Sequence, residues 1–136
     1  MKTFIASVLF LSALSTVNAE FFVSIDTRLI GNESVLQEVV DIIKREVDGI
    51  HDVTILDNSD QASIILRFHI AEVMTEGGVY YGSVIHMSVL VPFQSTNAGR
   101  QLLYIGDDMA GAPPDEYESL VSDMISDFDT LLENSR

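Results

Sequence analysis

The sequence predicts a two-layer α+β fold in which two helices pack on one face of a mostly antiparallel sheet, in the order β-α-β-β-β-β-α. Two observations carry this prediction. Two long runs of alternating apolar and polar residues, 62–74 and 79–93, flank Gly77 and Gly78, which is typical of a β-hairpin. Two other stretches have apolar residues at helical spacing, which predicts amphipathic helices.

The first half of the expected domain alternates between strand and helix signals. Residues 21–26 alternate between apolar and polar side chains, which predicts a first strand. Asn32 is a favourable cap for a helix over 34–48, and Gly49 provides its end. Residues 52–56 predict a short second strand. This segment therefore supplies the first helix of the helical layer.

The hairpin prediction includes a register. If Gly77 and Gly78 form a two-residue turn, paired residues have numbers that sum to 155. This pairing places eight apolar side chains on one face: Ile64, Leu66, Phe68 and Ile70 opposite Val91, Val89, Met87 and Ile85. A slip of one residue would turn one of the two apolar sets away from the core.

The last third of the chain predicts one more strand and a long helix. Residues 100–106 form the strand, with Tyr104 expected on the core side, as is Tyr81. Two prolines at 113–114 open the helix. The acidic residues directly after them are favourable there, because the first turn is the positive end of the helix dipole. Apolar side chains continue at helical spacing to Leu132. This second helix completes the expected helical layer.

Residues 1–19 have the three parts of a secretory signal peptide: a basic start, an apolar run and a small-residue cleavage site ending at Ala19. The sequence therefore predicts a single α+β domain over 20–136 that is periplasmic or secreted, with no membrane insertion after cleavage. It contains no cysteine, so the expected domain depends on its apolar core rather than on disulfides.

The charge balance restricts the possible partners. After removal of the signal, six Lys and Arg stand against 21 Asp and Glu, a formal charge near −15. Such a charge repels nucleic acids and anionic lipid surfaces. Nine of the acids lie within 107–133, where no Lys or Arg occurs. This run indicates a solvated helix face, and its alternative interpretation is a surface for a basic partner or a divalent cation.

The predicted register also defines the sheet face opposite the helices. This face mixes apolar and polar side chains, unlike a fully solvated sheet, and such patches often mark association sites. We expect it to contact another envelope protein or a second copy. Ordinary scatter of surface apolar residues, or cover by the expected loop 107–112, is the alternative. The predicted contact residues are Ile65, Arg67, His69, Val84, His86, Ser88, Leu90 and Leu103.

A second hypothesis concerns the two histidines. His69 and His86 satisfy the pairing rule, so their imidazoles are expected to face each other across two strands, with Cβ atoms about 5 Å apart. Together with an acid such as Asp107 or Asp108, they are candidate ligands for zinc or another transition metal. The alternative function is therefore a periplasmic protein that binds a metal or a small ligand through His69 and His86. Two facing histidines would also resist double protonation, which suggests pH sensing.

No pattern in the sequence indicates catalysis. It has no G-x-S-x-G motif and no phosphate-binding glycine loop, and so many carboxylates give no specific acid pair. We therefore expect a non-catalytic binding or accessory module that needs no cofactor.

The layout of the elements resembles the amino-terminal domain of the periplasmic protein TolB and related modules of outer-membrane assembly lipoproteins. The resemblance lies in the strand 21–26, the helix 34–48, the turn 57–61, the long strand from Ala62 and the hairpin after it. This chain has Ala62-Ser63 where those domains usually have Ala-Asp, and it lacks their strand glycine. The resemblance implies an envelope accessory that works by protein contact.

Overall fold

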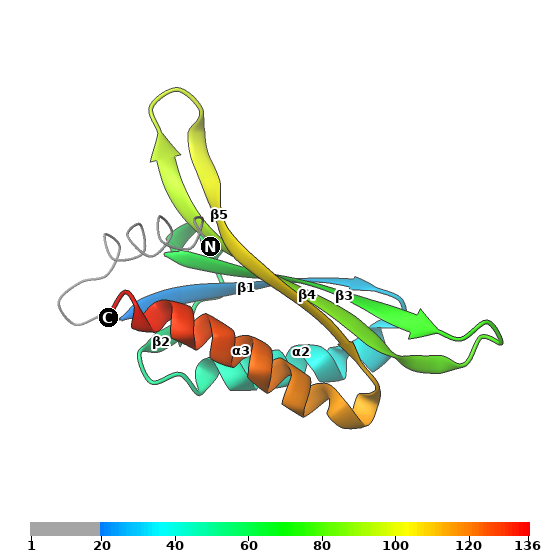
Figure 1. The fold of residues 1–136 in the computed structure, drawn as a ribbon. Coiled ribbons are helices and arrows are strands. Elements are labelled where there is room, and N and C mark those ends of the chain that lie inside the picture. Colours follow the sequence, from blue (N-terminus) through cyan, green and yellow to red (C-terminus); the bar gives the residue numbers. More distant parts are fainter. Residues whose placement is uncertain (1–19) are drawn as a thin grey trace.

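The computed structural model describes residues 20–136, and the predicted signal peptide lies outside this part of the chain. One five-stranded sheet has the strand order β2-β1-β3-β4-β5. Both long helices pack side by side against the same face of the sheet (Figure 1). The predicted α+β class and element order are thus confirmed. The elements are β1 Phe21–Ile30, α2 Glu33–Asp48, β2 Val53–Ile55, β3 Ile64–Met74, β4 Tyr80–Ser95, β5 Gly99–Ala112 and α3 Tyr117–Glu133, with short 3-10 turns at Ser59–Gln61 and Pro114–Glu116.

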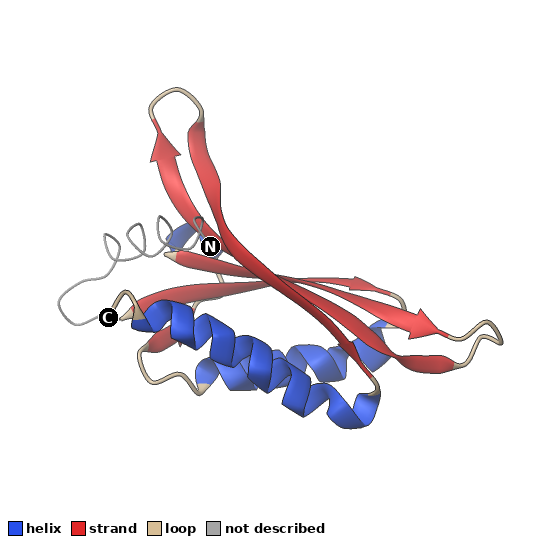
Figure 2. Ribbon diagram, in the orientation of Figure 1, coloured by secondary structure: helices blue, strands red, loops and turns tan. Residues whose placement is uncertain are grey.

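Antiparallel pairing dominates the sheet, but β1 is an exception. It pairs in parallel with β2 on one side and with β3 on the other, whereas β3, β4 and β5 pair antiparallel in sequence order. Since β2 and β3 flank β1, the segment between them has to cross β1. The β4–β5 hairpin extends beyond the rest of the sheet and twists away from it (Figure 2).

The helix α2 begins and ends where its sequence predicts. The Asn32 side chain accepts a hydrogen bond from the backbone N–H of Ser34 at 3.1 Å, which satisfies one of the free donors of the first turn. Gly49 caps the other end, where its N–H bonds to the carbonyl of Arg45. The helix buries a single apolar face against the sheet: Leu36, Val39, Val40, Ile42, Ile43 and Val47.

The predicted β3–β4 register is confirmed from Ile65, opposite Leu90, to Val73, opposite Gly82. It shifts by one residue at Met74, because the turn is longer than two residues. Gly78 adopts φ 76° and donates a hydrogen bond to the carbonyl of Thr75 at 2.9 Å. That left-handed conformation is accessible to glycine at little cost.

The β4–β5 pairing contains a β-bulge that the sequence did not reveal. Val89 pairs with Gly106, whereas the next residue, Leu90, pairs with Tyr104. Ile105 is therefore the extra residue of the bulge. Side chains alternate between the two faces along a strand, so the extra residue changes which β5 residues face the helices. Even-numbered residues before Ile105 and odd-numbered residues after it lie on the face opposite the helices.

The core lies between the sheet and the two helices. It contains the eight apolar side chains that the hairpin register placed together and the buried face of α3. Tyr117, at the start of α3, is 1% exposed, and its hydroxyl hydrogen-bonds with Ser83 at 2.8 Å. Burial raises the pKa of Tyr117 to about 12. No helix among residues 20–136 is both long enough and apolar enough to cross a membrane.

Candidate functional site

The candidate site is the sheet face opposite the helices, called here the open face. Cross-strand pairing arranges its side chains in rows that run over β1, β3, β4 and β5. Successive rows are Ser24-Ile65-Leu90-Tyr104, Asp26-Arg67-Ser88-Asp107, Arg28-His69-His86-Met109 and Ile30-Ala71-Val84-Gly111. Seven of the eight predicted contact residues therefore lie on one surface, and Leu103 does not.

Leu103 is on the opposite face. It pairs with Val91 and packs against the core, because the bulge at Ile105 reverses the alternation that the prediction assumed. For the same reason Tyr104, expected on the core side, lies on the open face and is 48% exposed. The expected loop 107–112 is also part of β5, so it does not cover this face.

Two of the predicted contact residues are not available for contact. Ile65 is 4% exposed and its row neighbour Leu90 is 8% exposed. The segment that crosses β1 between β2 and β3 lies at this end of the open face, where Asp57 and Ser59 share a small hollow with Ile65. Arg100 of β5 holds the segment in place through hydrogen bonds to the Asp60 carboxylate and the Ser59 carbonyl, both 2.5 Å.

The centre of the open face is polar, and its charges are paired. Arg67 donates to the Asp26 carboxylate at 2.9 Å across β3 and β1. Asp107 of β5 lies 2.9 Å from His86 Nε2 of β4. A hydrogen bond from the Tyr104 hydroxyl, followed by the bond to His86, holds the pKa of Asp107 below its usual value. The same bond with Asp107 raises the pKa of Tyr104.

The two histidines face each other as the register predicts. Their rings stack with centroids 6.0 Å apart and planes 20° apart. Stacked rings do not direct their nitrogen lone pairs at a common point, and the Nε2 of His86 already faces Asp107. Across residues 20–136, no group of three His, Asp or Glu side chains is placed to hold a metal ion. These side chains do not form a metal site in the described geometry, and the zinc site of His69, His86 and Asp107 stays a prediction.

Large exposed apolar side chains flank the polar centre on its two sides. They come from β1 and β5, the two strands that border the open face over most of its length, and the exposed fractions run from 40% to 66%: Phe22, Ile30, Leu102, Tyr104 and Met109. The sequence did not predict this set. From β5 it predicted only Leu103 for the open face, because it did not indicate the bulge at Ile105.

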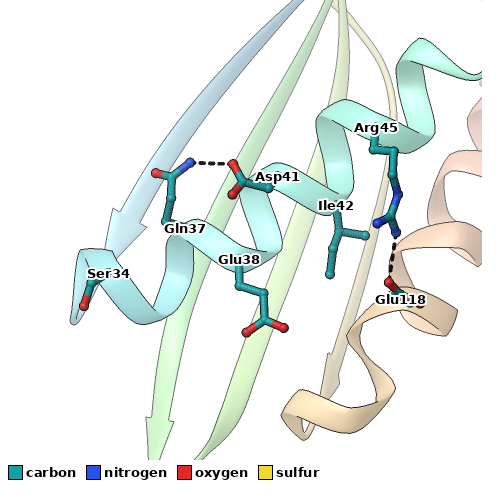
Figure 3. Close-up of a pocket in the computed structure, with 7 residues that line it drawn as sticks. All are labelled: Ser34, Gln37, Glu38, Asp41, Ile42, Arg45 and Glu118. Atoms are coloured by element: carbon teal, nitrogen blue, oxygen red, sulfur yellow. Dashed lines mark hydrogen bonds and ion pairs between the residues drawn. The ribbon is translucent and has the colours of Figure 1, made fainter.

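A hollow on the other side of the molecule has a simpler explanation. It lies along the outer face of α2 near the start of α3 and is lined mainly by polar side chains (Figure 3). Gln37 hydrogen-bonds to Asp41 at 3.0 Å, and Arg45 pairs with Glu118 at 3.1 Å. These exposed contacts are typical of a solvated helix surface.

Comparison with known proteins identifies the fold. No protein-family model and no curated protein sequence matches this chain. Two solved structures of PelC from Paraburkholderia phytofirmans, each described as a dodecamer, are similar at 12% identity. The L103M form has a TM-score of 0.51 over 90% of this chain and 93% of the PelC chain. The other form has a TM-score of 0.48 over 90% and 92%.

A third similar structure is the rare lipoprotein B of Shewanella oneidensis. Its TM-score is 0.25 at 12% identity, with 84% of this chain and 85% of that chain covered. The comparisons therefore establish a shared fold with PelC.

Proposed function

We propose that this protein is a non-catalytic accessory module of the cell envelope that binds another protein, or a second copy of itself, through the open face. The observation that carries the proposal is the set of five exposed apolar side chains on β1 and β5, on the two sides of a charge-paired centre. Exposed apolar patches with polar neighbours are characteristic of protein-binding surfaces.

Charge supports the same surface. Most of the described chain is strongly acidic, but on the open face Arg28 and Arg67 balance Asp26 and Asp107. A partner approaching this face therefore meets little of the repulsion that the rest of the surface would exert.

Two further points support a role in the envelope. Residues 1–19 have the pattern of a secretory signal peptide, and the layout resembles the TolB amino-terminal domain. PelC, which shares the fold, is described as a dodecamer. A second copy is accordingly one partner that we propose for the open face.

Charge substitution at the exposed apolar positions tests the proposal. Met109 and Ile30 are 66% and 63% exposed, so Met109→Asp and Ile30→Asp should leave folding intact. If the open face is the contact surface, each change should weaken association at least about tenfold, the loss expected for a contributing interface residue. The readouts are light scattering over a concentration series and photo-crosslinking from position 109 in the native envelope.

Val79 provides a matched control, because it is 64% exposed but lies in the β3–β4 turn, away from the rows of the open face. Val79→Asp should leave association and crosslinking unchanged. Equal effects of all three substitutions, or no effect of any, would contradict the proposal.

A further inference from the structure

A groove separates the core side of β5 from α3. Its volume is about 380 Å³, and its apolar lining comes from Met87 and Val89 of β4 and from Phe128 and Leu131 of α3. The β5 residues opposite Met87 and Val89 are Asp108 and Gly106. No large apolar side chain of β5 lies at this place, and the four apolar side chains of the floor, each 1–4% exposed, reach the groove with only a small part of their surface.

Acids surround the opening of the groove. Asp107 and Asp108 of β5 and Asp127 of α3 line it, and its lining includes no Lys or Arg. Burial, and then a hydrogen bond with Asp108, raise the pKa of Asp127, and the charge of Asp123 adds to this. Asp108 and Asp127 thus crowd each other without a cation among the lining residues, whereas Asp107 bonds to Tyr104 and His86.

The groove lies next to a free strand edge. β5 is the last strand in the sheet order and pairs only with β4 among the described residues. Its outer edge therefore offers backbone N–H and C=O groups to an added strand. Because α3 packs against β5, the groove lies beside this edge.

We propose that the groove and the outer edge of β5 together bind an extended segment of a partner protein that carries a large apolar residue flanked by Lys or Arg. In an added strand, residues two apart lie on the same side. The apolar side chain would enter the groove, and the long side chains of basic residues two positions before and after it would converge on the adjacent carboxyls of Asp108 and Asp127. Backbone hydrogen bonds to β5 would provide the remaining affinity.

The distribution of basic residues indicates that the occupant is a different protein. Apart from Lys2, this chain has six Lys and Arg: Arg28, Lys44, Arg45, Arg67, Arg100 and Arg136. The adjacent pair Lys44 and Arg45 is in α2, and no described strand contains two basic residues. A second copy therefore lacks an extended segment with the required pattern, whereas a basic partner is attracted by the acidic rim.

A synthetic peptide is the probe. Acetyl-Thr-Lys-Thr-Leu-Thr-Lys-Thr-amide has the required spacing, and its binding to the purified protein is measured by calorimetry and by amide hydrogen exchange. We expect binding that weakens as salt increases, with slower exchange in β5. A peptide with Glu in place of Lys, and one with Pro on each side of Leu, should not bind.

Two double variants with the same loss of charge separate the groove from the net charge. Asp108→Asn with Asp127→Asn should weaken peptide binding at least about fivefold, since two ion pairs are lost. Glu38→Gln with Asp41→Asn, on the outer face of α2, should change it less than about twofold. Ile30→Asp, on the open face, should leave it unchanged, which separates this proposal from the proposed function.

Three results would overturn the inference: no binding at millimolar peptide, an equal loss in both double variants, or exchange protection outside β5. Loss of self-association in the Asp108→Asn and Asp127→Asn variant, without peptide binding, would instead assign the groove to a second copy.

Discussion

The helix α3 carries two sets of acids that the structure places in opposite surroundings. Near its end, Asp129 and Glu133 join Asp52 around Arg136, at distances down to 2.5 Å. Earlier in the same helix, Asp127 faces Asp108, with Asp123 nearby and no basic side chain in the groove lining. One set is compensated by a cation, and the other is not.

The difference shows in the pKa values. Hydrogen bonds from Arg136 hold the pKa of Asp52 below its usual value, whereas burial and the Asp108 carboxyl raise the pKa of Asp127. A lowered carboxyl pKa means that folding favours the ionised form, and a raised one means the reverse. The first set therefore stabilises the fold at neutral pH. The second set lowers the stability of the fold at that pH, and a basic partner bound at the groove would offset this loss.

The largest effect should follow from removing Arg136. Its side chain is 14% exposed and that of Asp52 is 12% exposed, so Arg136→Ala leaves a poorly solvated carboxylate without its cation. We expect the free energy of unfolding to fall by about 2–3 kcal/mol, measured by urea denaturation at neutral pH.

Arg45→Ala is the control for this change. Arg45 pairs with Glu46 and Glu118 on an exposed helix surface, with 58% of its side chain accessible. Its loss should cost less than about 1 kcal/mol. Similar losses for the two variants would show that the Arg136 set is only a surface contact.

A smaller effect should appear in the pH dependence. Because the pKa of Asp52 in the folded protein is below its usual value, its contribution is present above the unfolded pKa and is lost as pH falls through the folded value. Asp52→Asn should therefore cost about 1–2 kcal/mol at neutral pH, and the difference from the native protein should decrease below about pH 4. A difference that stays constant down to about pH 2.5 would contradict this assignment.

The sequence predicted those features that depend on local alternation and turn residues. The opposition of His69 and His86 followed from the pattern of two strands and the glycines between them, and the structure confirms it. The longer turn at Thr75 shifted the register only at the hairpin end. Local signals were sufficient because one face of each strand is buried, which strongly specifies the register.

Features that depend on strand order or on one inserted residue were not predictable. The exposure of Met109 and the burial of Leu103 both depend on the bulge at Ile105. Gly106 beside it is compatible with a bulge, but it is equally compatible with the end of a strand, which is what the sequence predicts. The burial of Ile65 depends on a segment that crosses β1, which requires the positions of β2 and β3. The acids of 107–133 look uniform in the sequence, and only the position of Arg136 divides them.

The smallest expected effect tests the division of the α3 acids most directly, because two substitutions in one helix should change the free energy of unfolding in opposite directions. Asp127→Asn removes a repelled carboxylate and should raise the free energy of unfolding at neutral pH by a few tenths of a kcal/mol, about the size of one exposed charge interaction. Glu133→Gln removes a partner of Arg136, 2.6 Å away, and should lower it by about as much. Both variants lose one negative charge, so a general relief of repulsion would raise both values. As pH falls, the Asp127 carboxyl takes up its proton more readily in the folded state, so the gain in Asp127→Asn should disappear. Chemical denaturation at about pH 7 and about pH 4 provides the comparison, and equal signs for the two variants would show that α3 carries one uniform acidic surface.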